Sequence, residues 1–275
     1  MAAQRLFLRW LPSLLVALAY FAVGRLALLV ALPPTYVAPL YPSAGLALAA
    51  MLVYGARGAP GVALGAFAVN VSLTAQRGTV DALGMGIALA VALGAALQAA
   101  LGAWLVRRRV PSPPFFGEPR EVAALFFWGG AVACVTSALI STTALTLAGV
   151  TAAGDHFYTA WTWWSGDTLG VLIGAPIALI AIGRPRADWR ARATTLGLPL
   201  AAVPLLLAVA IVLVVRWDEQ RARGTFEREA QTISARVGAA LSEPLDALEA
   251  TRGIFIASED VTPDEMRKAT EAWLS

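Results

Sequence analysis

The sequence predicts an all-α protein: a polytopic transmembrane helical bundle of about seven spans, followed by a helical extracytoplasmic tail. Of its residues, 58% are hydrophobic and only 14% are charged, whereas soluble domains carry roughly a quarter charged residues. Apolar segments near 20 residues, the length that crosses a bilayer as a helix, recur up to Val215. Beyond Val215 the composition becomes that of a water-soluble segment.

The charge balance divides the chain into two parts, 1–215 and 216–275. The first part contains 13 arginines and 6 acidic residues, whereas the second contains 7 arginines, Lys268 and 12 acidic residues. The arginines of the first part stand in short runs between apolar segments, where membrane topology accounts for them. The pI near 9.4 therefore does not indicate binding to nucleic acid.

Seven apolar segments fit membrane helices. They are Trp10–Leu32, Leu40–Tyr54, Gly61–Ala75, Ala82–Val106, Val122–Leu147, Trp161–Ile182 and Thr194–Val215. The second and third are short and flank a Gly/Pro-rich break, which predicts a tight helical hairpin over 40–75. Two crossings are the favoured interpretation, and a re-entrant pair that does not cross is the alternative.

The distribution of arginines predicts the orientation. If the N-terminus is cytoplasmic, the short inside loops carry eleven arginines and the short outside loops carry only Arg77. The eleven are Arg5, Arg9, Arg57, Arg107, Arg108, Arg109, Arg120, Arg184, Arg186, Arg190 and Arg192. Seven crossings then place the chain from Arg216 onward outside the membrane.

The tail has the pattern of an amphipathic helix. Its apolar side chains recur every three or four residues, at Phe226, Ala230, Ile233, Val237, Leu241, Leu245 and Leu248. A second helix is expected from Pro263, with Thr262 as its cap. The helix from Asp218 to Leu248 is the candidate element for transmission and for a homodimer, and packing on its own domain is the alternative.

Polar side chains inside the spans are the candidates for function, because a charge within a membrane is costly. Arg25 and Asp167 lie roughly 10 Å and 9 Å from the outer ends of their spans, and Asn70 lies near the outer end of its own. We expect Arg25 and Asp167 to pair and to help line an outward-facing cavity; a purely structural ion pair is the alternative. Three tryptophans above them complete the candidate signal-input site: Trp161, Trp163 and Trp164.

Catalytic, cofactor and metal motifs are not found in the sequence. It contains no Walker loop, HExxH, GxSxG or kinase Gly-rich loop. With one histidine, His156, and one cysteine, Cys134, it has no multi-His or cysteine-cluster metal site. A membrane enzyme would have only Asp167 or His156 as a general base. We expect no catalytic residues and no cofactor.

Small residues recur around Asp167. Gly166, Gly170 and Gly174 follow one another every four residues, a spacing that lets helices approach closely. We expect this stripe to pack within the chain rather than at a dimer interface. Gln98 is expected to hydrogen-bond a neighbouring helix.

Two stretches carry a more specific signal. One begins Tyr41-Pro-Ser-Ala-Gly and continues through the Gly/Pro break to Asn70; the other is Trp163-Trp-Ser-Gly-Asp-Thr-Leu-Gly-Val-Leu-Ile-Gly-Ala-Pro-Ile177. Together they resemble the MASE1 family, the integral-membrane sensory domain of bacterial receptors, over roughly residues 10–215. Tyr41 is a departure, since tryptophan is expected at that position.

The tail is similar to the start of a CHASE domain, an extracytoplasmic ligand-binding module. The similar residues are Leu248–Ser258 and the Val-Thr-Pro-Asp-Glu that begins at Val261. This resemblance implies that the ligand-binding core follows Ser275 and that a later span returns to the cytoplasm. The output domain there would be a histidine kinase, a diguanylate cyclase or a phosphodiesterase.

These features predict a signal-input module of a bacterial receptor in the inner membrane. Its expected partners are the lipid bilayer, an unknown small ligand or membrane partner protein, and a second copy bound through the tail helix. The alternative is a small-solute transporter or channel, which glycine-broken short helices with polar groups would suit. Against it, the polar groups are few and lie toward one side, and the spans show no inverted repeat.

Overall fold

The computed structural model describes residues 2–29, 38–76, 78, 81–110, 116–257 and 260–270. Every regular element within these residues is a helix, which confirms the predicted all-α class. The chain forms two compact units, Met1–Ile211 and Val212–Ser275. Their boundary lies close to the change in composition at Val215.

The helices of the first unit follow the predicted apolar segments. In order they are α1 (Ala2–Leu28), α2 (Pro42–Tyr54), the 3-10 turn η1 (Gly55–Gly58), α3 (Ala59–Gln76), α4 (Ala82–Arg107), α5 (Pro119–Ala124), the π-helical segment η2 (Leu125–Val132), α6 (Ala133–Leu147), the 3-10 turn η3 (Ala153–Asp155), α7 (His156–Ile182), α8 (Arg186–Ala191), the π-helical segment η4 (Ala193–Gly197) and the beginning of α9 (Leu198–Ala257).

Five stretches of the described helices are long and apolar enough to cross a membrane. They are Trp10–Leu28, Pro42–Gln76, Ala82–Arg107, Pro119–Leu147 and Ala153–Ile182, and a shorter apolar helix covers Ala193–Ala202. The second stretch contains both α2 and α3, and the shorter helix lies where the seventh span is predicted. These helices therefore follow the first six predicted segments, apart from the end of the first, which lies outside the described residues, and the shorter helix covers the first part of the seventh.

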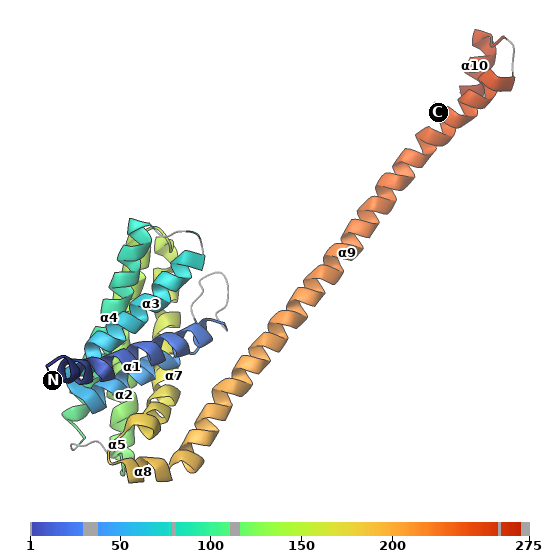
Figure 1. The fold of residues 1–275 in the computed structure, drawn as a ribbon. Coiled ribbons are helices and arrows are strands. Elements are labelled where there is room, and N and C mark those ends of the chain that lie inside the picture. The colour runs from blue at the N-terminus through green and yellow to red at the C-terminus, as the bar shows by residue number, and fades with distance from the viewer. Residues whose placement is uncertain are drawn as a thin grey trace. The chain divides into compact units, whose positions relative to one another are not determined.

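Six helices of the described part pack in a closed ring, in the order α1, α3, α4, α6, α7, α2 and back to α1. Figure 1 shows the bundle that they form from the side. Helix α2 also contacts α4 across the ring. At this crossing, the Leu48 side chain fits a notch that Gly102 and Gly129 leave open. A Cβ at Gly129 would lie 2.6 Å from Leu48 Cδ2. The bundle is therefore filled at the level of Leu48.

Helices α2 and α3 run in opposite directions along α1. At the start of α2, the Ser43 hydroxyl donates to the Tyr20 carbonyl oxygen; after its end, the Arg57 carbonyl accepts from Ser13. Helix α3 then returns until Val69 meets Gly24. The prediction of a tight hairpin is wrong in one respect: α2 packs mainly on α7, whereas α3 packs on α1 and α4.

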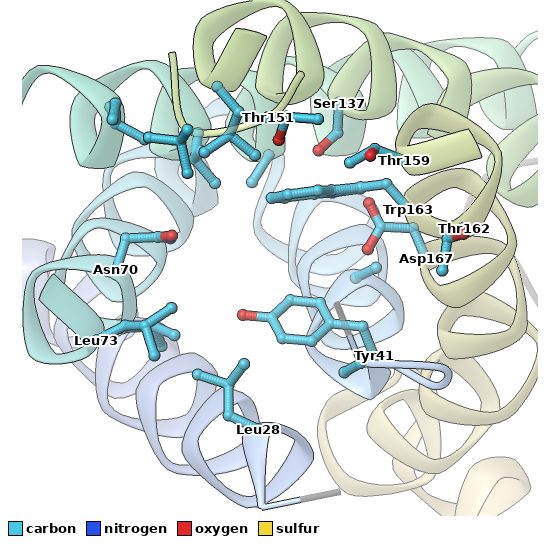
Figure 2. A pocket seen from close by; sticks show the side chains of 18 of the residues that line it. Leu28, Tyr41, Asn70, Leu73, Ser137, Thr151, Thr159, Thr162, Trp163 and Asp167 are labelled. Atoms are coloured by element: carbon cyan, nitrogen blue, oxygen red, sulfur yellow. The ribbon is translucent and has the colours of Figure 1, made fainter. Parts of the chain in front are cut away.

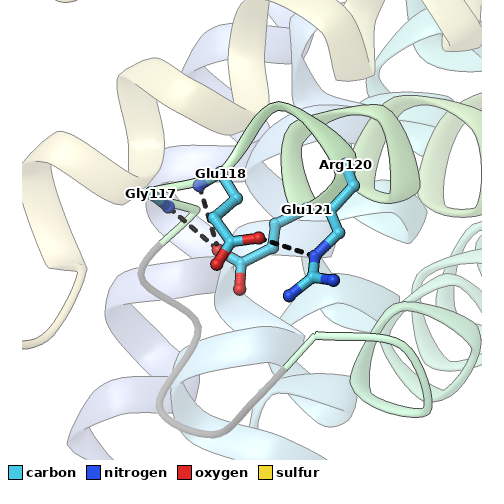
Figure 3. Close-up of polar contacts among 4 residues, drawn as sticks. All are labelled: Gly117, Glu118, Arg120 and Glu121. Carbon is cyan, nitrogen blue, oxygen red and sulfur yellow. Dashed lines mark hydrogen bonds and ion pairs between the residues drawn. The ribbon is translucent and has the colours of Figure 1, made fainter.

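The start of α5 shows how the sequence fixes a helix end. The Glu121 carboxylate accepts the backbone N–H groups of Gly117, at 2.9 Å, and Glu118, at 3.4 Å, as in the capping-box motif. Arg120 Nε lies 2.6 Å from Glu118 Oε2 (Figure 3). This cap begins the helix at Pro119, three residues before the predicted span at Val122.

The second unit contains the remainder of α9 and α10 (Pro263–Thr270). Helix α9 is continuous through the region where the amphipathic helix is predicted, and α10 begins at the predicted Pro263. The large apolar side chains of the predicted face are exposed, with fractions between 51% and 72%: Phe226, Ile233, Val237, Leu241, Leu245 and Leu248. No described residue of the unit covers this face.

Candidate functional site

A cavity of about 720 Å³ lies inside the helix ring of the first unit (Figure 2). Each of the six ring helices contributes to its wall, and it reaches the α6–α7 connection at Val150, Thr151, Ala152 and Asp155. The polar and aromatic side chains in the wall are Tyr20, Tyr41, Asn70, Gln98, Ser137, Thr151, Asp155, Tyr158, Thr159, Thr162, Trp163 and Asp167. Cavities of this size accommodate small-molecule ligands.

Asp167 is the charged group inside this cavity. Its side chain on α7 is only 5% exposed, and Gln98 on α4 and Ser137 on α6 are its polar neighbours. The structure shows no ion pair between Asp167 and any described residue. In Figure 2 the carboxylate lies beside the ring of Trp163.

Three glycines on α7 set the position of this carboxylate. Gly166, Gly170 and Gly174 face the backbone of residues 38–42, and a Cβ at Gly170 would overlap the Tyr41 carbonyl oxygen. The Tyr41 N–H donates to the Gly166 carbonyl oxygen at 3.0 Å. The expectation that this stripe packs within the chain is confirmed.

The rest of the wall includes residues from α1, α3 and the start of α2. The Tyr20 and Tyr41 rings meet edge to face, with centroids 6.2 Å apart. Figure 2 shows the Tyr41 hydroxyl and the Asn70 side chain projecting into the open space. Asn70 Nδ2 donates to the Ala66 carbonyl oxygen of its own helix at 2.9 Å, so its amide oxygen is left for other donors.

The structure brings three of the predicted site residues together and separates the others. Asn70, Trp163 and Asp167 line the cavity, whereas Arg25, Trp161 and Trp164 are not among its lining residues. Trp161 is 56% exposed, and its ring lies 4.9 Å from that of Trp164. Trp164 Nε1 donates to the Ala131 carbonyl oxygen at 2.7 Å, which ties α7 to η2.

The predicted Arg25–Asp167 pair is wrong. Arg25 Nη1 donates to Ser72 Oγ at 3.1 Å and to Gln76 Oε1 at 3.2 Å. The reason is the order of the ring: α1 packs on α3, which carries both acceptors, and α7 packs on α2 and α6 instead. Similar depth in the membrane did not imply the same side of the bundle.

The sequence analysis missed Tyr20, Tyr41 and Thr159 as cavity residues and placed the start of the sixth span at Trp161. Helix α7 begins at His156, directly after η3 and five residues before the predicted span. At this first residue, His156 Nδ1 lies 3.0 Å from Thr146 Oγ1 of α6. Asp167 therefore lies roughly 16 Å along α7. There Gln98 on α4 is one of its polar neighbours.

The charges in the cavity wall have one sign. Its acidic side chains are Asp155 and Asp167, and the wall contains no lysine, arginine or histidine among the described residues. The described residues also contain no group of three or more His, Cys, Asp or Glu side chains that would hold a metal ion. The site has the chemistry of a binding pocket for a small ligand.

The family model for MASE1 matches residues 10–216. The chain belongs to the MASE1 family. MASE1 is a membrane-associated sensory domain of receptor proteins. The match includes the helix ring from residue 10 onward and every residue that lines the cavity, so the cavity lies in the MASE1 domain. Neither a curated protein nor a solved structure matches the chain.

Proposed function

We propose that the chain is the signal-input module of a bacterial inner-membrane receptor. A small ligand or a membrane partner protein occupies the cavity around Asp167 and favours one packing of the helix ring. The N-terminus is cytoplasmic, the α6–α7 connection faces outward, and the tail from 216 is extracytoplasmic and begins a CHASE-like domain. A cytoplasmic kinase or cyclic di-GMP enzyme receives the signal.

The observation that carries this proposal is the double role of α7. At Thr159, Trp163 and Asp167 it lines the cavity, and toward its other end it packs on α8 and η4. A Cβ at Gly197 of η4 would lie 3.1 Å from Ile180 Cδ1. Since α9 begins directly after η4, a displacement of α7 by a ligand is transmitted to the start of α9 through packed atoms.

The exposed apolar face of α9 supports a homodimer. Its side chains recur at steps of three and four residues, as in two-stranded coiled coils, and the described residues of the second unit leave it uncovered. A second copy supplies an identical face at the same height. In this arrangement α9 is both the transmission element and the dimer contact.

A small-solute transporter or channel is the second candidate, favoured by a cavity that six membrane helices enclose. The closed level at Leu48, between Gly102 and Gly129, opposes it. A transporter would move solute in liposomes that contain only this chain. The receptor proposal predicts no such flux.

The orientation is tested by cysteine accessibility in intact cells. In a Cys134→Ser background, single cysteines replace Ala152, Asp188 and Asp260, and a membrane-impermeant thiol reagent is applied. We expect labelling of the first and third sites and protection of the second. Protection of the Asp260 site, combined with its labelling by a permeant reagent, would place the tail in the cytoplasm and move the transporter to first place.

A further inference from the structure

The cavity wall contains two acidic side chains and no basic side chain among the described residues. Asp167 is buried, Asp155 lies at the exposed end, and no cationic side chain belongs to the wall among the described residues. Arg25, which the sequence predicts to pair with Asp167, donates hydrogen bonds to Ser72 and Gln76 instead. Ionising a buried carboxyl group without a cation beside it is costly, and a cationic ligand beside Asp167 would lower that cost.

Two further groups in the wall lack partners. Gln98 Oε1 and Thr159 Oγ1 are buried, with residues only 4% and 1% exposed, and neither atom has a hydrogen-bond partner among the described residues. A glutamine oxygen accepts hydrogen bonds but cannot donate them. The ligand that satisfies Gln98 and Asp167 together must therefore present N–H or O–H donors.

The remaining wall fits an organic cation. Trp163, Tyr20 and Tyr41 supply aromatic rings, whose faces attract ammonium groups. An apolar surface for a hydrocarbon body comes from the aliphatic side chains of Leu28, Leu73, Ile87, Val91 and Val150. The exposed Asp155 carboxylate adds to a field that draws cations toward the opening.

We infer that the cavity binds a small organic cation, a protonated primary or secondary amine with an apolar body. Its ammonium group donates to the Asp167 carboxylate and to Gln98 Oε1, beside the ring of Trp163. This inference rests on the proposed function, because it assigns a ligand class to the same input site. A carboxylate or phosphate ligand would meet only like charge, and a quaternary ammonium would leave Gln98 Oε1 without a donor.

Binding is measured by calorimetry on the whole chain in nanodiscs at pH 7.5. The probes are the hydrochlorides of phenethylamine and hexylamine, with 2-phenylethanol and 3-phenylpropionate as the neutral and anionic analogues. We expect at least one amine to bind about tenfold more tightly than the alcohol, because hydrogen bonds to charged groups are stronger than those between neutral groups. We expect no binding of the acid.

Matched variants assign the binding to the cavity. Asp167→Asn keeps the shape of the side chain and removes its charge, and we expect about a tenfold loss of amine affinity with no loss of alcohol affinity. Gln98→Leu is the second variant, and we expect it to lower the amine affinity several-fold. Asp188→Asn removes an exposed carboxylate on α8, outside the cavity, and leaves the affinity unchanged.

The inference is overturned if the amine and the alcohol bind with equal affinity, or if Asp167→Asn binds the amine as the wild type does. Failure of both amines to bind a folded wild-type chain also overturns it. None of these results contradicts the signal-input proposal, which is tested separately by the response of α9 to changes at Asp167. Conversely, an amine that binds without any response of α9 supports the ligand class and contradicts the receptor.

Discussion

Single side chains determine how closely the ring helices pack and which polar groups face the cavity. Asp167 is buried without a cationic partner among the described residues, and the glycines next to it let α7 contact the backbone at Tyr41. The first feature costs stability, whereas the second allows close packing. Substitutions at the two kinds of position should therefore have opposite effects on stability.

Asp167→Asn should leave the thermal midpoint of the folded chain unchanged or raise it by a few degrees. The substitution removes a buried charge that has no ion pair and keeps the volume of the side chain. Thermal unfolding in detergent, followed by tryptophan fluorescence, measures this. A midpoint several degrees lower would mean that the carboxylate is a structural element of the bundle.

Gly170→Ala should destabilise the domain by about 1–3 kcal/mol, the usual cost of overpacking, because its Cβ would overlap the Tyr41 carbonyl oxygen. Gly86→Ala on α4 is the matched control, since no atom lies within 4 Å of its Cβ. There we expect a gain of about 0.5–1 kcal/mol from helix propensity. Equal effects of the two substitutions would contradict the packing described for α7.

The contacts between neighbouring helices determine which side chains pair. The depth of a residue within its predicted span does not determine its partner. Arg25 on α1 binds two acceptors on α3, and Trp164 on α7 binds a carbonyl in η2. Both contacts join helices that are neighbours in the ring. Each can be tested against a control on the same helix or at the same depth.

The Arg25–α3 contact should appear in a double-mutant cycle. We expect a coupling free energy of about 0.5 kcal/mol or more between Arg25→Ala and Gln76→Ala, because their side chains share a hydrogen bond. Between Arg25→Ala and Asp167→Ala the coupling should be near zero. Restoration of stability by the charge swap Arg25→Asp with Asp167→Arg would show that the ion pair exists after all.

Trp164→Phe should cost about 1 kcal/mol, because the Ala131 carbonyl oxygen loses its indole donor while the ring volume is largely kept. Trp161→Phe is the control: its ring is mostly exposed, and we expect a change below about 0.5 kcal/mol. Chemical denaturation in mixed micelles compares the two. A larger effect at Trp161 would contradict the structure.

At the scale of the whole molecule, the sequence predicted the architecture better than the site. Spans such as Ala82–Val106 follow from length and hydropathy alone, and the break at Gly55–Pro60 follows from local turn chemistry. Neither property reports the order of helices around a ring. Arg25 was therefore assigned to the wrong partner, and Tyr20, an ordinary aromatic residue within an apolar span, gave no signal as a cavity residue.

The site was partly predictable because polar residues within apolar spans are rare. This rule found Asn70 and Asp167, and both line the cavity. It did not give the start of α7, because the polar residues before Trp161 are helical as well, so that α7 is longer than its apolar segment. The role of the cavity as an input site remains a proposal that these contacts support.

The most direct test of the central claim is disulfide cross-linking on α9 in native membranes. Leu241→Cys, in a Cys134→Ser background, is oxidised alone, with Asp167→Asn, and with Asp188→Asn as the control. The account predicts that the parent cross-links to a dimer, that Asp167→Asn changes the rate several-fold, and that Asp188→Asn does not. The same rate in all three, or no cross-linked dimer in any, would contradict the account.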